Sequence, residues 1–196
     1  MQIMKVALLA LLACVCVAAF GKEPKVVRVR IETEFGNIDM DLYPDKAPAT
    51  VENFLKYVEA GMYDNAVFHR TVTLANQPSN KVKIEVIQGG RNPRSSLKDF
   101  SPIPLERTSK SGLRHLDGTV SMARNGPDTA TCDFFICIGS QPELDFGGKR
   151  NLDGQGFAAF GKVTSGMDVV ARIQRAPEKD QTLVPPIRIL SIRILP

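Results

Sequence analysis

The sequence predicts a mainly β protein, a closed antiparallel barrel of about eight short strands accompanied by two α-helices. Eight short runs show the apolar character or the apolar-polar alternation of strands, and two longer segments show helical spacing. Loops rich in Gly, Pro, Asn and Ser separate these segments. Closure into a barrel is favoured because it leaves no exposed sheet edge. No internal repeat or linker divides the sequence, so one domain is expected.

Composition agrees with one soluble domain and argues against several functional classes. The chain has 196 residues, of which 43% are hydrophobic and 23% are charged, as is typical of globular domains. The net charge of +4 is spread along the sequence, and no basic block or aromatic-basic stripe indicates nucleic-acid binding. Four cysteines are too few for a disulfide scaffold in a chain of this length.

The first residues predict a secretory signal peptide over residues 1–21. A short basic start precedes an unbroken apolar run over 6–20, and polar residues follow, which is the pattern of an export signal. Cleavage is expected after Gly21, with Ala19 as the alternative. Because the run is shorter than the ~20 residues of a spanning helix, we expect an exported, periplasmic or secreted domain with no stable membrane insertion. The alternatives are an uncleaved anchor and lipid attachment through Cys14.

The mature chain is predicted to open with a β-hairpin and a helix. Residues 27–32 and 38–42 alternate apolar and polar side chains, and residues 34–37 carry the turn between them. Thr50 is placed to cap a helix that Gly61 would terminate. The buried face of this helix has i, i+3, i+4, i+7 spacing through Val51, Phe54, Leu55 and Val58.

Six further strands and a second helix complete the prediction. The strands are expected at 66–72, 82–88, 119–123, 134–138, 158–163 and 187–195, and the helix at 165–174. Two cysteines, Cys132 and Cys137, lie in this part of the chain. Their odd separation along one extended stretch would point them to opposite faces, so two buried thiols are favoured over a disulfide.

Common signatures of metal, nucleotide and hydrolase chemistry are missing from the sequence. Its two histidines, His69 and His115, are not accompanied by the Cys or His cluster that a zinc site needs. No phosphate-binding loop, dinucleotide fingerprint or Gly-x-Ser-x-Gly motif is present. A Ser–His–Asp triad built from distant residues is not excluded by composition. No metal and no cofactor are expected.

Five short motifs in a fixed order form the remaining candidate site. They are Phe68-His69-Arg70, Ile87-Gln88-Gly89-Gly90, Ser121-Met122-Ala123, Phe134-Phe135-Ile136 and Phe160-Gly161-Lys162-Val163. Taken alone, they are strand segments with one arginine among apolar neighbours. Such an arginine needs acceptors for its five N–H groups, which Gln88 or a structural salt bridge would supply.

These ordered motifs resemble the cyclophilin family of peptidyl-prolyl cis-trans isomerases, and the likeness extends over residues 27–196. The exported bacterial members are the most similar. The resemblance implies an eight-stranded antiparallel β-barrel capped by two α-helices. It also implies a monomer without a cofactor that acts on proline-containing unfolded or extended polypeptides.

By the same resemblance, Arg70 and Gln88 are the expected catalytic residues. An X–Pro bond isomerises slowly because amide resonance sets a barrier of roughly 18–20 kcal/mol. Arg70 would donate a hydrogen bond to the amide nitrogen or to the neighbouring carbonyl of the twisted bond. Gln88 would help hold the arginine and the peptide backbone.

The resemblance also implies a set of substrate-binding residues. They are Val86, Ala123, Arg124, Asp133, Phe135, Leu152 and Phe157. Phe135 would form the floor of an apolar proline pocket, and its walls would be Val86, Leu152 and Phe157. Backbone groups around Ala123 and Arg124 would bind the extended peptide.

Several residues depart from the family pattern at the rim of this pocket. Glu85 and Val86 stand where a Phe-Met pair is common, Asp133 replaces a Gln, and Arg124 replaces a common Asn. Phe157 stands where a His is common. Two functions therefore stay open: an isomerase that assists the folding of exported proteins, and a low-activity proline-peptide binding module or chaperone.

Overall fold

The structure, a computed structural model, describes residues 25–92 and 94–196. The predicted signal peptide over residues 1–21 lies outside this part of the chain. Among the described residues, no helix combines the length and the apolar character needed to cross a membrane.

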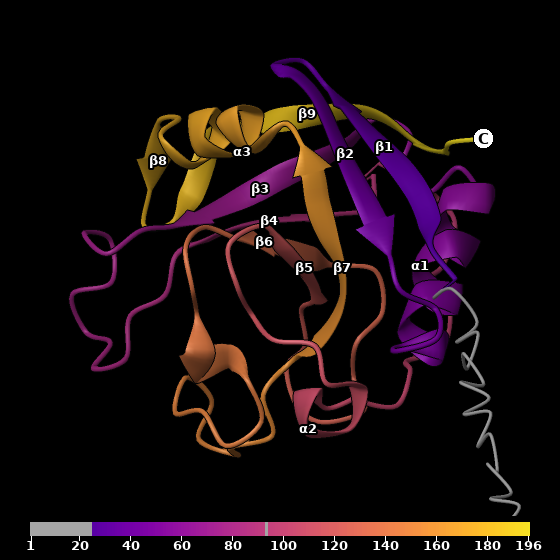
Figure 1. Ribbon diagram of the computed structural model, residues 1–196. Helices are drawn as coiled ribbons and strands as arrows, with labels where there is room; N and C mark the ends of the chain where they lie inside the picture. Colours follow the sequence, from indigo (N-terminus) through magenta and orange to yellow (C-terminus); the bar gives the residue numbers. More distant parts are fainter. Residues whose placement is uncertain (1–24, 93) are drawn as a thin grey trace, which may run out of the picture.

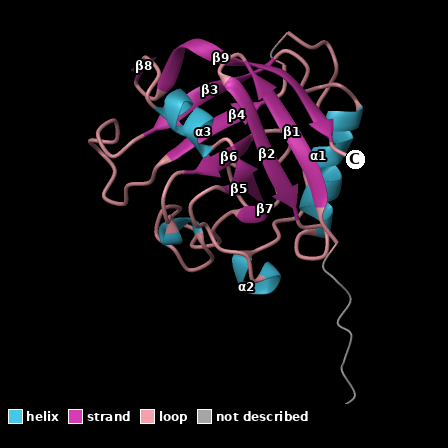
Figure 2. Cartoon of the chain, turned by 45° about the horizontal axis from the view of Figure 1, so that its top comes forward, coloured by secondary structure: helices cyan, strands magenta, loops and turns pink. Residues whose placement is uncertain are grey.

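In the described part of the chain, nine strands form one antiparallel sheet that closes into a barrel (Figures 1 and 2). Their bounds are β1 Val27–Thr33, β2 Gly36–Leu42, β3 Ala66–Val72, β4 Val86–Gly90, β5 Thr119–Met122, β6 Phe134–Cys137, β7 Ala158–Ser165, β8 Glu178–Lys179 and β9 Thr182–Ile194. Eight of them follow the order β1-β2-β7-β5-β6-β4-β3-β9, and the pairing of β1 with β9 closes the ring. The short β8 pairs with β9 beyond the ring. The eight-stranded barrel predicted from the sequence is therefore confirmed.

The described chain has three α-helices: α1 (Pro48–Glu59), α2 (Thr108–Ser111) and α3 (Met167–Gln174). Helix α1 packs near β7 and β9, and α3 packs near β2, β3 and β4. Both views show α1 and α3 on opposite sides of the barrel (Figures 1 and 2). These two are the predicted capping helices, whereas α2 is too short for helical periodicity to reveal it.

The barrel encloses one apolar core and carries a second apolar cluster on its outer side. Inside, the ring of Phe54 on α1 lies 5.5 Å from Phe134 and 5.3 Å from Phe160. The outer cluster consists of Val72, Ile84, Val86, Phe135, Cys137 and Leu144. Because successive strand residues face opposite sides, Phe134 points into the core and Phe135 into the outer cluster. The candidate site lies at this outer cluster.

The prediction that Thr50 caps the first helix is wrong. Helix α1 begins at Pro48, a residue type suited to the first helical turn. The carboxylate of Glu106 accepts hydrogen bonds from the backbone N–H groups of Ala49 and Thr50, at 3.1 and 2.8 Å. It also accepts the Thr50 hydroxyl at 2.6 Å. A residue distant in sequence thus accepts hydrogen bonds from the free N–H groups of the first helical turn. Local capping patterns could not indicate this residue.

The predicted strand over 82–88 begins only at Val86. The buried side chain of Gln77 takes the place of a strand neighbour for Ile84. Its Nε2 donates to the Ile84 carbonyl at 2.7 Å, and its Oε1 accepts the Ile84 N–H at 3.3 Å. Residues 73–85 are therefore a loop closed by a side-chain amide.

The last strand is longer than predicted, because β9 begins at Thr182 instead of residue 187. Pro185 and Pro186 lie between Thr182 and Ile187, the residues that pair with β3, and so occupy positions where no ladder N–H is required. The second helix also starts later than predicted, because β7 continues to Ser165 before α3 begins.

Cys132 and Cys137 are both free and buried, which confirms the prediction of two thiols. Cys132 lies just before β6 instead of within the strand. Burial raises the pKa of the Cys132 thiol to about 11, so this group stays protonated and unreactive near neutral pH.

Candidate active site

Strand register places the central site residues side by side across four strands. Arg70 on β3 pairs with Gln88 on β4, and Gln88 pairs with Phe135 on β6. Phe135 in turn pairs with Ser121 on β5. A β-bulge between Phe68 and Arg70 inserts one extra residue into β3. Arg70 consequently faces the outer side of the barrel while Phe68 stays in the core.

A cavity of about 360 Å³ lies over this row of residues. It brings together Arg70, Val86, Gln88, Ala123, Arg124, Asp133, Phe135 and Phe157. All the predicted site residues except Leu152 thus line one cavity. Ile84, Leu144 and Arg150 join them from the covering loops.

The prediction that Leu152 forms a pocket wall is wrong. A tight turn, in which the Gly154 N–H donates to the Asn151 carbonyl at 3.0 Å, carries Leu152 into solvent, and its side chain is fully exposed. The leucine that lines the cavity is Leu144, buried in the outer cluster at the end of a 3-10 turn over Pro142–Leu144. The choice between the two leucines depends on loop geometry, which the sequence pattern did not reveal.

Arg70 is held by two amide side chains. Its Nη1 donates to Gln88 Oε1 at 3.0 Å, while its Nε and Nη2 donate to Gln181 Oε1 at 3.1 and 2.6 Å. Burial lowers the pKa of Arg70, yet a guanidinium remains charged at neutral pH. These bonds use three of its five N–H groups. They orient the group without neutralising its charge.

Gln181 is a site residue that sequence reasoning missed. It lies in the turn between β8 and β9 and adopts a left-handed backbone conformation, φ 71°, which is uncommon for a residue other than glycine. Its backbone N–H donates to Glu178 at 2.6 Å, and its Nε2 donates to the Asn76 carbonyl at 3.0 Å. No motif marks this glutamine, because it reaches Arg70 from a distant hairpin.

The floor of the cavity is an aromatic stack centred on Phe135. The ring of Phe157 meets it edge-on, with centroids 5.3 Å apart, and the buried ring of His115 stacks on it at 5.9 Å. Val86 and Leu144 belong to the same cluster. The result is an apolar floor beside the Arg70 guanidinium, which suits a proline ring next to a polarised amide.

A buried Ser–His–Asp chain supports this floor. His115 Nδ1 lies 2.7 Å from Asp145 Oδ1, and His115 Nε2 lies 2.9 Å from Ser121 Oγ. Burial of Asp145 opposes its ionisation, but the hydrogen bonds from His115 outweigh burial and lower the pKa of the carboxyl group. Ser121 and His115 are both fully buried, so the serine is not accessible to a substrate carbonyl. The chain holds the His115 ring against Phe135.

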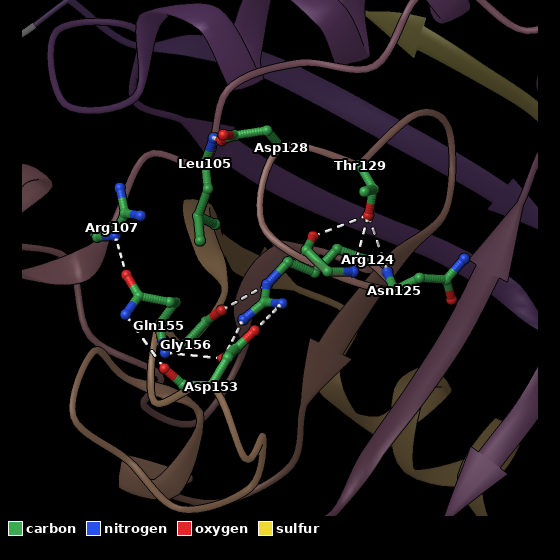
Figure 3. Close-up of polar contacts among 10 residues, drawn as sticks. Leu105, Arg107, Arg124, Asn125, Asp128, Thr129, Asp153, Gln155 and Gly156 are labelled. Atoms are coloured by element: carbon green, nitrogen blue, oxygen red, sulfur yellow. Dashed lines mark hydrogen bonds and ion pairs between the residues drawn. The ribbon is translucent and has the colours of Figure 1, made fainter.

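The Arg124 side chain is bound within the fold. As Figure 3 shows, its side chain reaches the loop over 145–157, where Nη1 and Nη2 donate to the Asp153 carboxylate at 2.7 and 3.0 Å. Its Nε donates to the Gly156 carbonyl at 2.8 Å. The side chain is 1% exposed and lies over the Phe157 ring at 5.1 Å. Arg124 thus ties one wall of the cavity to the barrel.

Asp133 lies on the side of the cavity where Gln88 and His69 meet. Gln88 Nε2 donates to Asp133 Oδ2 at 3.1 Å, and His69 Nε2 lies 3.6 Å from the same oxygen. A Cβ atom at Gly90 would collide with the Asp133 carboxylate. The second glycine of the Ile-Gln-Gly-Gly motif therefore makes room for the residue that orients Gln88.

The described residues contain no group of three or more His, Cys, Asp or Glu side chains arranged to hold a metal ion. The class defined by this geometry is a closed β-barrel with an apolar surface pocket beside a positioned guanidinium.

Comparison with known proteins places the chain within that class. The family model "Cyclophilin type peptidyl-prolyl cis-trans isomerase/CLD" matches residues 28–194. A peptidyl-prolyl cis-trans isomerase of Acinetobacter baylyi is 34% identical, over 85% of this chain and 84% of the relative. Peptidyl-prolyl cis-trans isomerase B of Escherichia coli is 35% identical, over 74% of this chain and 83% of the relative.

The structural comparison agrees with the sequence comparison. A crystal structure of a cyclophilin-type peptidyl-prolyl cis-trans isomerase of Cryptosporidium parvum has a TM-score of 0.71 at 25% identity, and the likeness covers 88% of this chain and 99% of that one. The chain therefore belongs to the cyclophilin family of peptidyl-prolyl cis-trans isomerases. Its activity is the cis-trans isomerisation of peptidyl-prolyl bonds.

Proposed function

We propose that Arg70 accelerates isomerisation by donating a hydrogen bond to the twisting X–Pro amide while the proline ring rests on Phe135. The observation that carries this proposal is the environment of Arg70. Amides hold its guanidinium in place, and it lines the same cavity as the apolar floor. Its full positive charge and its remaining N–H groups are available to a substrate.

The chemistry needs no covalent step. Rotation about the X–Pro bond breaks amide resonance and returns the lone pair to the nitrogen, which is the origin of the roughly 18–20 kcal/mol barrier. A donor fixed beside that nitrogen, or beside the neighbouring carbonyl, binds the twisted state better than the planar one. Each tenfold acceleration requires about 1.4 kcal/mol of such differential binding.

Gln88 and Gln181 act on the reaction through Arg70. Gln88 uses its carbonyl oxygen for Arg70 and its amide nitrogen for Asp133, so its orientation is fixed from both ends. Gln181 accepts two hydrogen bonds from the same arginine. A positioned donor loses little orientational freedom when the amide twists, which makes it more effective than a mobile one.

The test is an isomerisation assay on a short X–Pro peptide with the wild type and Arg70→Ala. We expect the substitution to lower kcat/KM by about a hundredfold or more, the range found when a positioned charge-stabilising donor is removed. Thermal unfolding of both proteins controls for folding. Equal rates for two folded proteins would contradict the role of Arg70 and leave the fold unaffected.

A second candidate function is a proline-peptide binding module or chaperone of low activity. The observation that favours it is Asp133, a charged residue that lines the cavity where the family pattern has a Gln. The same assay separates the two functions. Peptide binding without acceleration by the wild type would favour the binding module.

We also propose that the protein is exported and assists the folding of exported polypeptides as a monomer. Support comes from the sequence pattern of residues 1–21, a basic start followed by an apolar run and a polar turn. Fractionation of the expressing cells, with mass spectrometry of the N-terminus, tests this. Cleavage after Gly21 or Ala19 with the product outside the cytoplasm is expected, and a full-length cytoplasmic product would contradict it. A lipid on Cys14 would instead indicate membrane attachment.

A further inference from the structure

The cavity is lined by three arginines that differ in how their charges are compensated. Arg70, Arg124 and Arg150 all line it, and the acidic residue among the lining residues is Asp133. Arg124 is already neutralised, because both of its terminal nitrogens bind the Asp153 carboxylate (Figure 3).

The other two arginines have only uncharged partners. Arg70 binds the amide oxygens of Gln88 and Gln181. Arg150 Nη1 donates to the Gln77 side chain at 2.9 Å and to the Val82 carbonyl at 2.6 Å. Of the ion pairs formed by the described residues, none includes Arg70 or Arg150.

Asp133 does not compensate these two charges by direct contact. Its carboxylate binds Gln88 and faces His69, 3.6 Å away. Burial, and after it the positive charge of Arg70, lowers the pKa of Arg150. Arg150 therefore presents at the cavity a positive charge that an anionic group of a substrate would compensate.

Resting on the proposed isomerase function, we propose that Arg150 forms a subsite for the carboxylate of an Asp or Glu residue next to the proline of the substrate. An arginine presents a planar fork of donors that matches a carboxylate. Arg150 uses Nη1 for the loop over 73–85, which leaves its Nε and Nη2 groups for this contact.

The proposed subsite makes the enzyme selective for acidic sequences around proline. Because the cavity is open to solvent, salt and water screen the interaction, so we expect about a fivefold preference for Glu over Gln. The Arg124 side of the cavity contributes no such preference, since Asp153 already occupies its donors.

The experiment measures kcat/KM for peptides that carry Glu, Gln or Lys immediately before or immediately after the proline. All peptides end in an amide, which removes the terminal carboxylate as a competing ligand. The variants are Arg150→Gln and Arg150→Glu. The matched control is Arg175→Gln, because Arg175 is exposed and does not line the cavity but its substitution changes the net charge equally.

We expect the wild type and Arg175→Gln to prefer Glu over Gln about fivefold in at least one of the two positions, with Lys poorest. Arg150→Gln should abolish this preference, measured as the ratio of kcat/KM for the Glu and Gln peptides within each protein, and Arg150→Glu should favour Lys. Raising the salt concentration should weaken the wild-type preference. Thermal unfolding confirms that each variant is folded.

Two results would overturn the subsite. One is a wild type that turns over the Glu and Gln peptides equally in both positions. The other is a folded Arg150→Gln that keeps the preference. If no peptide is accelerated, the isomerase proposal fails separately, and fluorescence anisotropy with the same labelled peptides then decides the subsite. Equal affinity for Glu and Gln peptides would overturn it, and tighter binding of Glu that Arg150→Gln abolishes would support it.

Discussion

Arg124 and Arg70 line the same cavity but have opposite relations to the fold. The Arg124 guanidinium is closed off by a carboxylate and a backbone carbonyl, whereas Arg70 is held only by neutral amides. A carboxylate within the fold compensates the positive charge of an arginine. Amide acceptors orient the guanidinium group and leave its charge uncompensated. The comparison teaches that the partners of a pocket arginine, more than its position, decide whether it acts on a substrate.

The substitution Gln181→Glu would remove the difference between the two arginines, because Arg70 would gain a carboxylate partner as Arg124 has in Asp153. A carboxylate in place of the Gln181 amide would form an ion pair with Arg70 and compensate its charge. We expect kcat/KM to fall by about tenfold to a hundredfold, with a Tm no lower than that of Gln181→Ala. The measurement is the X–Pro isomerisation assay together with thermal unfolding.

Gln181→Ala is the control for that change. Both substitutions remove the hydrogen bond to the Asn76 carbonyl, but only Gln181→Glu adds a charge. We therefore expect Gln181→Ala to be the more active of the two variants. A fully active Gln181→Glu would show that compensating the charge of Arg70 is harmless.

Asp153→Asn tests the other side of the cavity by removing the charge that neutralises Arg124. The buried Arg124 guanidinium would lose its ionic partner, although the new amide oxygen can still accept a hydrogen bond. We expect a loss of about 1–2 kcal/mol in unfolding free energy, with kcat/KM changing far less than in Gln181→Glu. Denaturant titration measures the first quantity. An unchanged unfolding free energy would mean that the ion pair shown in Figure 3 does not stabilise the fold.

The pH dependence of stability should also distinguish the two arginines. The hydrogen bond from Arg124 holds the pKa of Asp153 below its usual range. A carboxyl whose pKa is lowered by folding stabilises the protein above its unfolded pKa, about 3.9, and this contribution disappears as the pH falls through the lower folded pKa. The Tm difference between wild type and Asp153→Asn should thus be constant from pH 8 to about pH 5 and shrink below about pH 4.

The Tm difference between wild type and Arg70→Ala should stay constant over this pH range, because Arg70 is held by neutral amides, which do not titrate. Asp145, which also has a lowered pKa, is present in every protein compared and cancels in the differences. A wild-type advantage over Asp153→Asn that persists unchanged at pH 3 would contradict the assigned ion pair.

The smallest effect is expected at Leu152, in the same loop as Asp153. Since its side chain is fully exposed, Leu152→Ala should leave kcat/KM within about twofold and stability within about 0.5 kcal/mol. Leu144→Ala should instead cost about 2–5 kcal/mol of stability and lower kcat/KM, because Leu144 is buried in the outer cluster. If Leu152→Ala impaired catalysis, the loop would adopt another arrangement when substrate binds.

The sequence could predict the parts of the site that strand periodicity controls. Alternation on β6 separates Phe134 from Phe135, and the motif that contains Arg70 lies on a strand whose predicted bounds, 66–72, are the observed ones. The strand that contains Gln88 was also predicted, although its start was placed four residues too early. The barrel itself followed from the number of short strands and from the need to cover their edges.

The remaining features depend on contacts that no local pattern encodes. Glu106 caps α1, and the Gln77 side chain takes the place of a strand neighbour for Ile84. Gln181 binds Arg70 from a distant hairpin, and Arg150 lines the cavity from a loop that is far from Arg70 in sequence. These two side chains belong to the site only because the tertiary structure brings them there. The same is true of Leu144, which occupies the place that the sequence analysis gave to Leu152.

The most direct test of the account is a double comparison of Arg70→Ala with Arg124→Asn. For each folded variant, kcat/KM on one X–Pro peptide and the unfolding free energy are measured together. The account predicts that Arg70→Ala loses about a hundredfold or more in kcat/KM with little loss of stability, while Arg124→Asn loses stability and keeps most of its activity. Catalysis that survives in Arg70→Ala and collapses in a stable Arg124→Asn would contradict it.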